Sequence, residues 1–177
     1  MRNIDWDFIS DREGVETTGY VPRNKDNTID ENSGVTIGAG FDLGQQTEET
    51  IKNLGFKDLS ILDAVKPYLG LKGAKADEVA KNLTIPEDKL PDFNNTVNNY
   101  YADNIEKQYN KYTKYKKFNE LDPALQTVIT SVGFQYGDLK RTPNFFKEVL
   151  NDNIEGVVAE LRDFGDDYSS RRNLEAD

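Results

Sequence analysis

The sequence has 177 residues, a length that fits a single domain of one or two lobes. It contains no Cys and no His, which excludes disulfides, thiol nucleophiles, Cys/His zinc sites and catalytic triads built on histidine. Asp and Glu number 32 against 22 Lys and Arg, giving a net charge of -10. This balance argues against a nucleic-acid partner and leaves acid–base chemistry mainly to carboxylates.

No stretch of the sequence approaches the roughly 18 apolar residues that a membrane helix needs. The first ten residues also lack the apolar segment of a signal peptide. We therefore expect the chain to be made in the cytoplasm and not to insert into a membrane.

The first 50 residues predict a short helix followed by a small antiparallel sheet. Asp5 can cap a helix over residues 6–12, and Gly14 can end it. Residues 15–45 are rich in Gly, Thr, Asn and Asp, and short apolar runs among them predict strands. These runs are Tyr20-Val21, Thr28-Ile29 and Val35-Thr36-Ile37.

The pattern becomes helical after Thr47, which begins a helix that Gly55 ends. The clearest helix covers residues 122–136, where Asp122 is the cap and Pro123 takes the first helical position. The other helices are predicted over residues 59–69 and 76–83, within 93–118, over 143–150 with Thr142 as cap, and over 153–161 and 168–176.

These elements predict an α+β fold in one domain, residues 1–177. A small antiparallel-sheet N-lobe covers about residues 1–55, and a larger, mainly helical lobe covers about 56–177. We expect the C-terminal helix to return to the N-lobe.

Two carboxylates are candidate catalytic residues because of their neighbours in the sequence. Glu13 ends the first predicted helix, where apolar neighbours could bury it partly and raise its pKa. Asp42 lies in Gly40-Phe41-Asp42-Leu43-Gly44, where glycines let the backbone approach a ligand closely. The alternatives are a solvated surface glutamate at Glu13, a turn-stabilising aspartate at Asp42 and an ordinary strand residue at Thr36.

Several motifs occur in a characteristic order. Within 32 residues the chain has Glu13-Gly14, Gly19-Tyr20, Gly34-Val35-Thr36-Ile37-Gly38-Ala39-Gly40 and Asp42-Leu43-Gly44. Later come Phe134-Gln135-Tyr136-Gly137, Thr142-Pro143-Asn144-Phe145-Phe146 and Arg171-Arg172-Asn173-Leu174-Glu175-Ala176. This set resembles the phage-type lysozymes, and more closely the lysozyme domains of pesticin-like toxins, so it implies a lysozyme-like fold.

The resemblance implies roles for individual residues. Glu13 takes the position of the general acid, and Thr36 takes that of the threonine that holds water. The second carboxylate is either Asp42, six residues after Thr36, or Asp30, six residues before it. The Gly-x-Gly-Phe-Asp-Leu-Gly context, with Phe41 in place of the histidine of phage lysozymes, favours Asp42.

The implied reaction is hydrolysis of the β-1,4 bond between N-acetylmuramic acid and N-acetylglucosamine in peptidoglycan, with no cofactor and no metal. One arginine of the Arg171-Arg172 pair is expected to reach Glu13. Gln135, Tyr20 and Tyr136 are the candidate substrate-binding residues. The alternative functions are a lytic transglycosylase and a non-catalytic peptidoglycan-binding module on the same fold.

The resemblance also implies a biological setting. We expect a monomeric antibacterial effector or toxin domain that acts at the cell wall or periplasm after delivery by lysis, uptake or a secretion system. Its partners would be peptidoglycan glycan strands and an immunity or inhibitor protein. Residues 107–118 contain five lysines and no acid. They are either a basic surface that receives the polymer or a solvated helix face.

Overall fold

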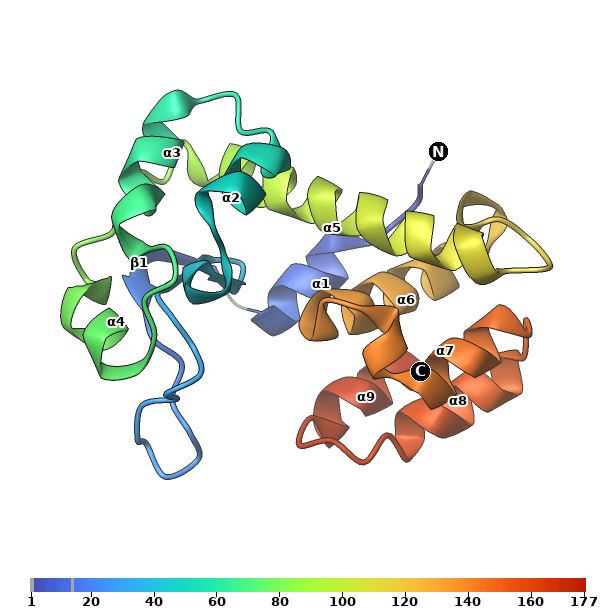
Figure 1. Ribbon diagram of the computed structural model, residues 1–177. Helices are drawn as coiled ribbons and strands as arrows, with labels where there is room; N and C mark the ends of the chain where they lie inside the picture. Colours follow the sequence, from blue (N-terminus) through green and yellow to red (C-terminus); the bar gives the residue numbers. More distant parts are fainter. Residues whose placement is uncertain (1, 14) are drawn as a thin grey trace. The chain divides into compact units, whose positions relative to one another are not determined.

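The computed structural model describes residues 2–13 and 15–177, with only the backbone described for Arg12 and Glu13 (Figure 1). Its contacts group into two compact units, which are described separately below. One unit comprises Met1–Arg12 and Tyr101–Asp177, and the other comprises Glu13–Tyr100. The prediction of a single lysozyme-like domain with two lobes stays a prediction.

The unit of residues 13–100 contains a three-stranded antiparallel sheet in the order β1-β2-β3. Its strands are β1 (Glu16–Tyr20), β2 (Thr36–Gly38) and β3 (Phe41–Asp42). Its helices are α2 (Glu48–Leu54), α3 (Leu59–Val65), α4 (Gly73–Ala80) and the first half of α5 (Leu90–Tyr112). In Figure 1, α4 lies beside β1, and the close approach of Gly19 to the carbonyl of Ala80 agrees with this.

The core of this unit is aromatic where α5 covers the sheet. Phe93 of α5 stacks on Phe56 at 5.2 Å between ring centroids and meets Phe41 of β3 edge-on at 6.0 Å. Ile37 of β2 is fully buried. The side-chain carbonyl of Asn94, also on α5, accepts from the backbone N–H of Ala39 at 3.2 Å. These contacts fix the hairpin between β2 and β3.

The other unit is helical. It contains α1 (Trp6–Glu13) up to Arg12, the second half of α5, α6 (Pro123–Tyr136), α7 (Pro143–Leu150), α8 (Ile154–Arg162) and α9 (Ser169–Ala176). Figure 1 shows α7, α8 and α9 grouped together below α6. Apolar residues of α6, Ile129 and Val132 among them, lie in a cluster with Phe145 of α7 and Leu161 of α8. Across the described residues, no helix is long and apolar enough to cross a membrane.

Helix ends follow the predicted signals closely. Asp5 accepts from the N–H of Phe8 at 2.9 Å, and Asp122 accepts from that of Ala124 at 2.9 Å. Thr47 caps α2 in a reciprocal box with Thr50, and Gly55 ends it with a φ of 81°. The α+β prediction is confirmed.

Two local predictions are wrong. Thr28-Ile29 forms no strand, because its loop folds back on itself at Asn27 (φ 66°) and makes only an isolated bridge from Arg23 to Ile29. Thr142 does not cap α7 with its side chain. Its hydroxyl instead donates to the carbonyl of Leu139 at 2.9 Å, closing the short 3-10 helix Leu139–Arg141 that precedes α7.

Candidate functional site

Three predicted site residues lie in one row across the sheet. Tyr20 of β1 is paired with Thr36 of β2, and Thr36 is paired with Asp42 of β3. Directly opposed residues on antiparallel strands place their side chains on the same face, about 5 Å apart at Cβ. The fold therefore brings together a threonine and an aspartate that the sequence singles out separately.

The carboxylate of Asp42 is held by the backbone of its own loop. Oδ1 accepts from the N–H of Gly34 at 3.0 Å and from that of Gly44 at 2.8 Å. Oδ2 accepts from the side-chain amide of Gln45 at 3.2 Å. A carboxylate oxygen offers about two lone pairs, so the two backbone bonds occupy Oδ1 and leave acceptor capacity on Oδ2.

The glycines around Asp42 allow this arrangement. A Cβ on Gly34 would lie 2.3 Å from the Cα of Gly44 and 2.4 Å from the carbonyl oxygen of Leu71. Any side chain at Gly34 would force these backbone segments apart. The turn-stabilising role that we considered for Asp42 is therefore real, since its carboxylate joins both segments.

Thr36 is buried, and its hydroxyl donates to the carbonyl of Gly34 at 3.2 Å. A threonine hydroxyl that donates in this way still has two lone pairs on the same oxygen. The backbone of Gly34 thus orients both the Thr36 hydroxyl and the Asp42 carboxylate. The pair can present one hydroxyl oxygen and one carboxylate oxygen to a small polar group.

Asp30, the alternative carboxylate, lies in the loop before β2 and not in the cross-strand row. It accepts from the N–H of Asn32 at 2.9 Å and from the hydroxyl of Ser33 at 2.9 Å. These two bonds hold the pKa of Asp30 below its usual value. Its contacts are those of an aspartate that closes a surface turn.

Glu13, the predicted general acid, is the last residue of α1, and its side chain lies outside the described part of the structure, as does Gly14. The chain order still places Glu13 three residues before β1 begins at Glu16.

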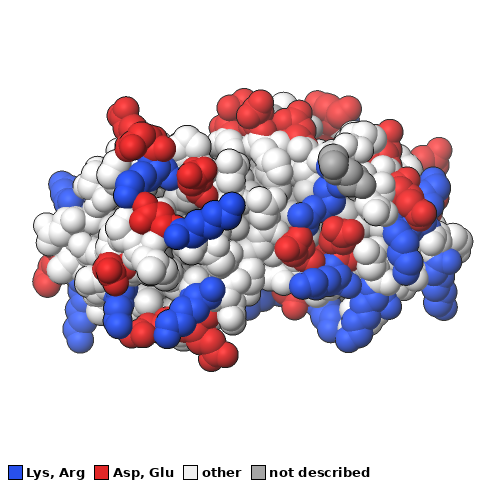
Figure 2. Space-filling view, turned by 90° about the horizontal axis from the view of Figure 1, so that it is seen from above, with Lys and Arg blue, Asp and Glu red and all other residues white. Residues whose placement is uncertain are grey.

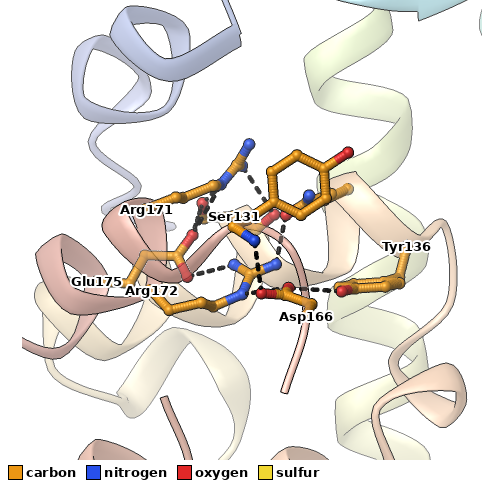
Figure 3. A network of polar contacts seen from close by, with 8 residues as sticks. Ser131, Tyr136, Asp166, Arg171, Arg172 and Glu175 are labelled. Atoms are coloured by element: carbon orange, nitrogen blue, oxygen red, sulfur yellow. Dashed lines mark hydrogen bonds and ion pairs between the residues drawn. The ribbon is translucent and has the colours of Figure 1, made fainter. Parts of the chain in front are cut away.

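The C-terminal arginines belong to a buried network that the sequence does not reveal in full (Figure 3). Arg172 is 1% exposed and donates through all three nitrogens. Nε bonds Asp166 at 3.0 Å, Nη1 bonds Glu175, and Nη2 bonds the side-chain carbonyl of Gln135. Its guanidinium carbon also lies 4.5 Å from the ring centroid of Phe164.

Arg171 belongs to the same network and shares Glu175 with Arg172. Its Nε bonds Glu175 at 3.1 Å, and Nη2 bonds the hydroxyl of Ser131 at 3.0 Å. The Ser131 hydroxyl in turn donates to Glu175. Two arginines thus share one buried glutamate, and Asp166 balances the second positive charge.

The predicted substrate-binding residues Gln135 and Tyr136 are tied into this network. The Tyr136 hydroxyl donates to Asp166 at 2.7 Å, and its ring lies 5.6 Å from the guanidinium carbon of Arg172. Burial and the Asp166 carboxylate together raise the pKa of Tyr136. Burial opposes ionisation of Asp166, but bonds from Tyr136 and other donors outweigh it and lower the Asp166 pKa.

Tyr136 also borders an open pocket of about 210 Å³. The lining is polar and aromatic, with Arg141, Asn144, Glu160, Phe164 and Asp166 among its residues. Substrate contact by Gln135, Tyr20 or Tyr136 stays a prediction.

Sequence reasoning missed Ser131, Asp166 and Glu175. A signal for Glu175 was present, because it stands three and four residues after the two arginines on one helix face. Ser131 and Asp166 had no such signal, since they lie on other elements. Among the described residues, no group of three or more Asp and Glu could hold a metal ion.

The comparisons with known proteins agree with the motifs. Residues 3–155 match the Pesticin family, described as a bacterial toxin homologue of phage lysozyme, C-terminal part. No curated protein matches the chain. The matched range includes Glu13, Thr36 and Asp42, whereas the network arginines of α9 lie beyond it.

A match over this range, together with the α+β fold, supports a glycoside hydrolase-like enzyme of the lysozyme type. The chain belongs to the Pesticin family, the bacterial toxin homologues of phage lysozyme.

Proposed function

We propose that this chain is a muramidase that hydrolyses the β-1,4 bond between N-acetylmuramic acid and N-acetylglucosamine in peptidoglycan. The observation that carries the proposal is the pairing of Thr36 with Asp42 across β2 and β3. In a member of a lysozyme-like family, this pair supplies a hydroxyl and a carboxylate side by side, as attack by water requires.

Glu13 acts as the general acid in this proposal. It donates its proton to the glycosidic oxygen as the bond to the anomeric carbon breaks. A carboxyl group serves as an acid near neutral pH only when its surroundings raise its pKa. The proposal therefore requires that the surroundings of Glu13 raise its pKa.

Asp42 stays ionised and receives the proton of the attacking water. Because Gly34 and Gly44 occupy Oδ1, the water binds at Oδ2. The Thr36 hydroxyl oxygen accepts the second hydrogen bond of this water and aims its lone pair at the anomeric carbon. In this inverting route the carboxyl groups of Glu13 and Asp42 stand roughly 6.5–9.5 Å apart, with room for the water between them.

Asp42 is preferred over Asp30 on geometry. Asp42 is paired with Thr36 across β2 and β3. Asp30 lies outside the strands, and its carboxylate bonds residues of its own turn.

The arginine pair acts as a support in this account. Arg172 bonds Asp166, Glu175 and Gln135 through its three nitrogens. One arginine of the Arg171-Arg172 pair is proposed to reach Glu13. Gln135, Tyr20 and Tyr136 are the proposed sugar contacts.

In its biological setting the chain is proposed to be an antibacterial effector that acts on the wall after delivery by lysis, uptake or a secretion system. A cognate immunity protein would protect the producer, and the enzyme would act as a monomer.

Glu13→Gln tests the acid directly. The variant should solubilise purified peptidoglycan at least roughly 10²-fold more slowly, the usual contribution of a general acid. Glu16→Gln is the matched control, because Glu16 is an exposed glutamate at the start of β1 and should keep wild-type activity. Equal rates for Glu13→Gln and wild type would refute the assignment.

A further inference from the structure

The basic residues of this acidic chain are concentrated in two segments. Residues 107–118 and 139–147 together contain eight Lys and Arg and no Asp or Glu. The rest of the chain has 14 basic residues against 32 acidic ones. Figure 2 shows blue side chains gathered at the right-hand end of the view, the end at which α5 finishes in Figure 1.

The two segments meet at Tyr112, the last residue of α5. The ammonium of Lys111 lies 5.4 Å from the Tyr112 ring centroid, and that of Lys140 lies 5.1 Å from it. Phe146 of α7 meets the same ring edge-on at 6.0 Å. Tyr112 is thus fixed by packing and holds two ammonium groups close to one ring.

A hydrogen bond to the Tyr112 hydroxyl raises the pKa of Lys140, so this ammonium stays charged at neutral pH. Asp138 attracts Lys140, and Asp138 and Asp152 also have other partners. Asp138 accepts from the Gln108 amide and the Lys140 backbone, and Asp152 lies 3.6 Å from the ammonium of Lys116.

The surface also presents aromatic rings to solvent. Tyr112 is 38% exposed, and Tyr115, in the turn after α5, is 62% exposed. That turn is held by the Thr113 hydroxyl, which accepts from the N–H of Tyr115 at 3.2 Å and donates to the carbonyl of Lys116 at 3.2 Å. We name the group Lys111, Tyr112, Tyr115 and Lys140 the Tyr112 patch.

Exposed tyrosines among lysines suit a polymer that combines sugar rings with negative charges. The C–H faces of sugar rings pack on aromatic rings, and phosphate or carboxylate groups pair with ammonium groups. The acidic remainder of the chain repels such a polymer, so attraction is confined to the patch within a distance of about 8–10 Å.

We propose that the Tyr112 patch is a binding surface for an anionic glycopolymer of the bacterial cell wall, separate from the residues assigned to catalysis. The proposal rests on the muramidase function, because that function selects the wall over other polyanions. The patch would retain the enzyme on its insoluble substrate between cleavage events.

Co-sedimentation with purified cell walls tests the proposal in the Glu13→Gln background, where the walls should stay intact. Adding Lys111→Gln with Lys140→Gln should weaken binding about tenfold, as expected for two exposed ion pairs. Adding Lys75→Gln with Lys81→Gln is the matched control, since it removes the same charge from exposed residues at α4 and should leave binding unchanged. Replacing the same two lysines with arginine, as Lys111→Arg with Lys140→Arg, should keep the binding of the Glu13→Gln chain. Tyr115→Ala should weaken binding without lowering the melting temperature.

Walls stripped of phosphate polymers by acid separate the two sources of charge. A loss of patch-dependent binding after stripping identifies the phosphates as the ligand, and retained binding identifies the carboxylates of peptidoglycan. Equal binding by the Gln pair and its control would overturn the proposal, as would patch-dependent binding to duplex DNA with none to walls.

These outcomes are independent of catalysis. A chain that keeps Glu13 and carries only the patch substitutions should hydrolyse short soluble wall fragments at the wild-type rate. Loss of hydrolysis by Glu13→Gln with normal wall binding would leave both proposals standing.

Discussion

At the scale of single residues, Asp42 combines two roles that the sequence presents as alternatives. Its Oδ1 joins the backbone at Gly34 to the backbone at Gly44, a structural task. Its Oδ2, which accepts from Gln45, is the atom that we assign to the reaction. A substitution that replaces Oδ2 and keeps Oδ1 can therefore remove the proposed catalytic role and keep the structural one.

Asp42→Asn makes this separation. The amide oxygen can keep both backbone bonds, whereas the amide nitrogen replaces the reacting oxygen and gives up the bond from Gln45. We expect a melting temperature close to that of wild type and a release of reducing ends at least roughly 10²-fold slower. Asp42→Ala should lose activity and also about 0.5–2 kcal/mol of stability, because the loop loses its cap.

Asp30→Asn is the comparison for Asp42→Asn. It changes the same functional group in the other candidate and should keep most of the activity. Full activity in Asp42→Asn with an inactive Asp30→Asn would move the second carboxylate to Asp30.

Asp58 gives a prediction of pH dependence. Its bond from Lys89 at 2.7 Å, with bonds from Ser60, lowers the pKa of Asp58 to about 2. A carboxylate with a lowered folded-state pKa stabilises the protein above its unfolded pKa, near 4, and loses that contribution as the pH falls through about 2. Asp58→Asn should therefore melt lower than wild type at pH 6, and the difference should disappear near pH 2. A difference that persists unchanged at pH 2 would contradict the pairing.

At the scale of elements, the helices and the presence of a small antiparallel sheet were predictable, but not every short strand was. The helix over 122–136 has a cap, a proline at its first position and a terminal glycine, and it forms as α6 over Pro123–Tyr136. Strands β2 and β3 have only three and two residues, which is too short for an alternating pattern to define their ends. The Thr28-Ile29 run has the composition of a strand but pairs only within its own loop.

The ion pairs of α9 also depend on residues that its own sequence does not reveal. The Arg171-Arg172 pair stood out in the sequence, but its buried counter-charges come partly from Asp166, outside the helix. Removing the Arg172 guanidinium takes away the ion pair of Asp166 and one of the two arginines that pair with the buried Glu175, and breaking a buried ion pair is costly.

Arg172→Met should therefore destabilise the protein strongly, by about 3–5 kcal/mol. Arg162→Met is the control, because Arg162 forms an exposed ion pair with Asp177 at 2.7 Å and its loss should change stability by less than about 0.5 kcal/mol. Urea unfolding followed by the fluorescence of Trp6, the sole tryptophan, reports on the unit that contains both arginines. Equal shifts for the two variants would show that the network contributes little.

At the scale of the whole molecule, the sequence predicted the fold class and the family, and its motifs singled out Thr36 and Asp42 as candidate site residues. It could not show that one aspartate oxygen is occupied by the backbone, because that depends on glycines ten residues apart meeting in space. It also could not show that the two basic segments meet at Tyr112.

The net charge of -10 is compatible with an anionic substrate once its distribution is considered. All 32 acidic residues lie outside the two segments that meet at Tyr112. A protein can therefore repel a polymer over most of its surface and still bind it at one place.

The central claim is that this chain cleaves peptidoglycan by adding water. Mass spectrometry of the fragments that the wild-type chain releases from purified peptidoglycan tests it most directly. We expect fragments that end in reducing N-acetylmuramic acid. Fragments that end in 1,6-anhydro-N-acetylmuramic acid, or no fragments at all, would contradict it.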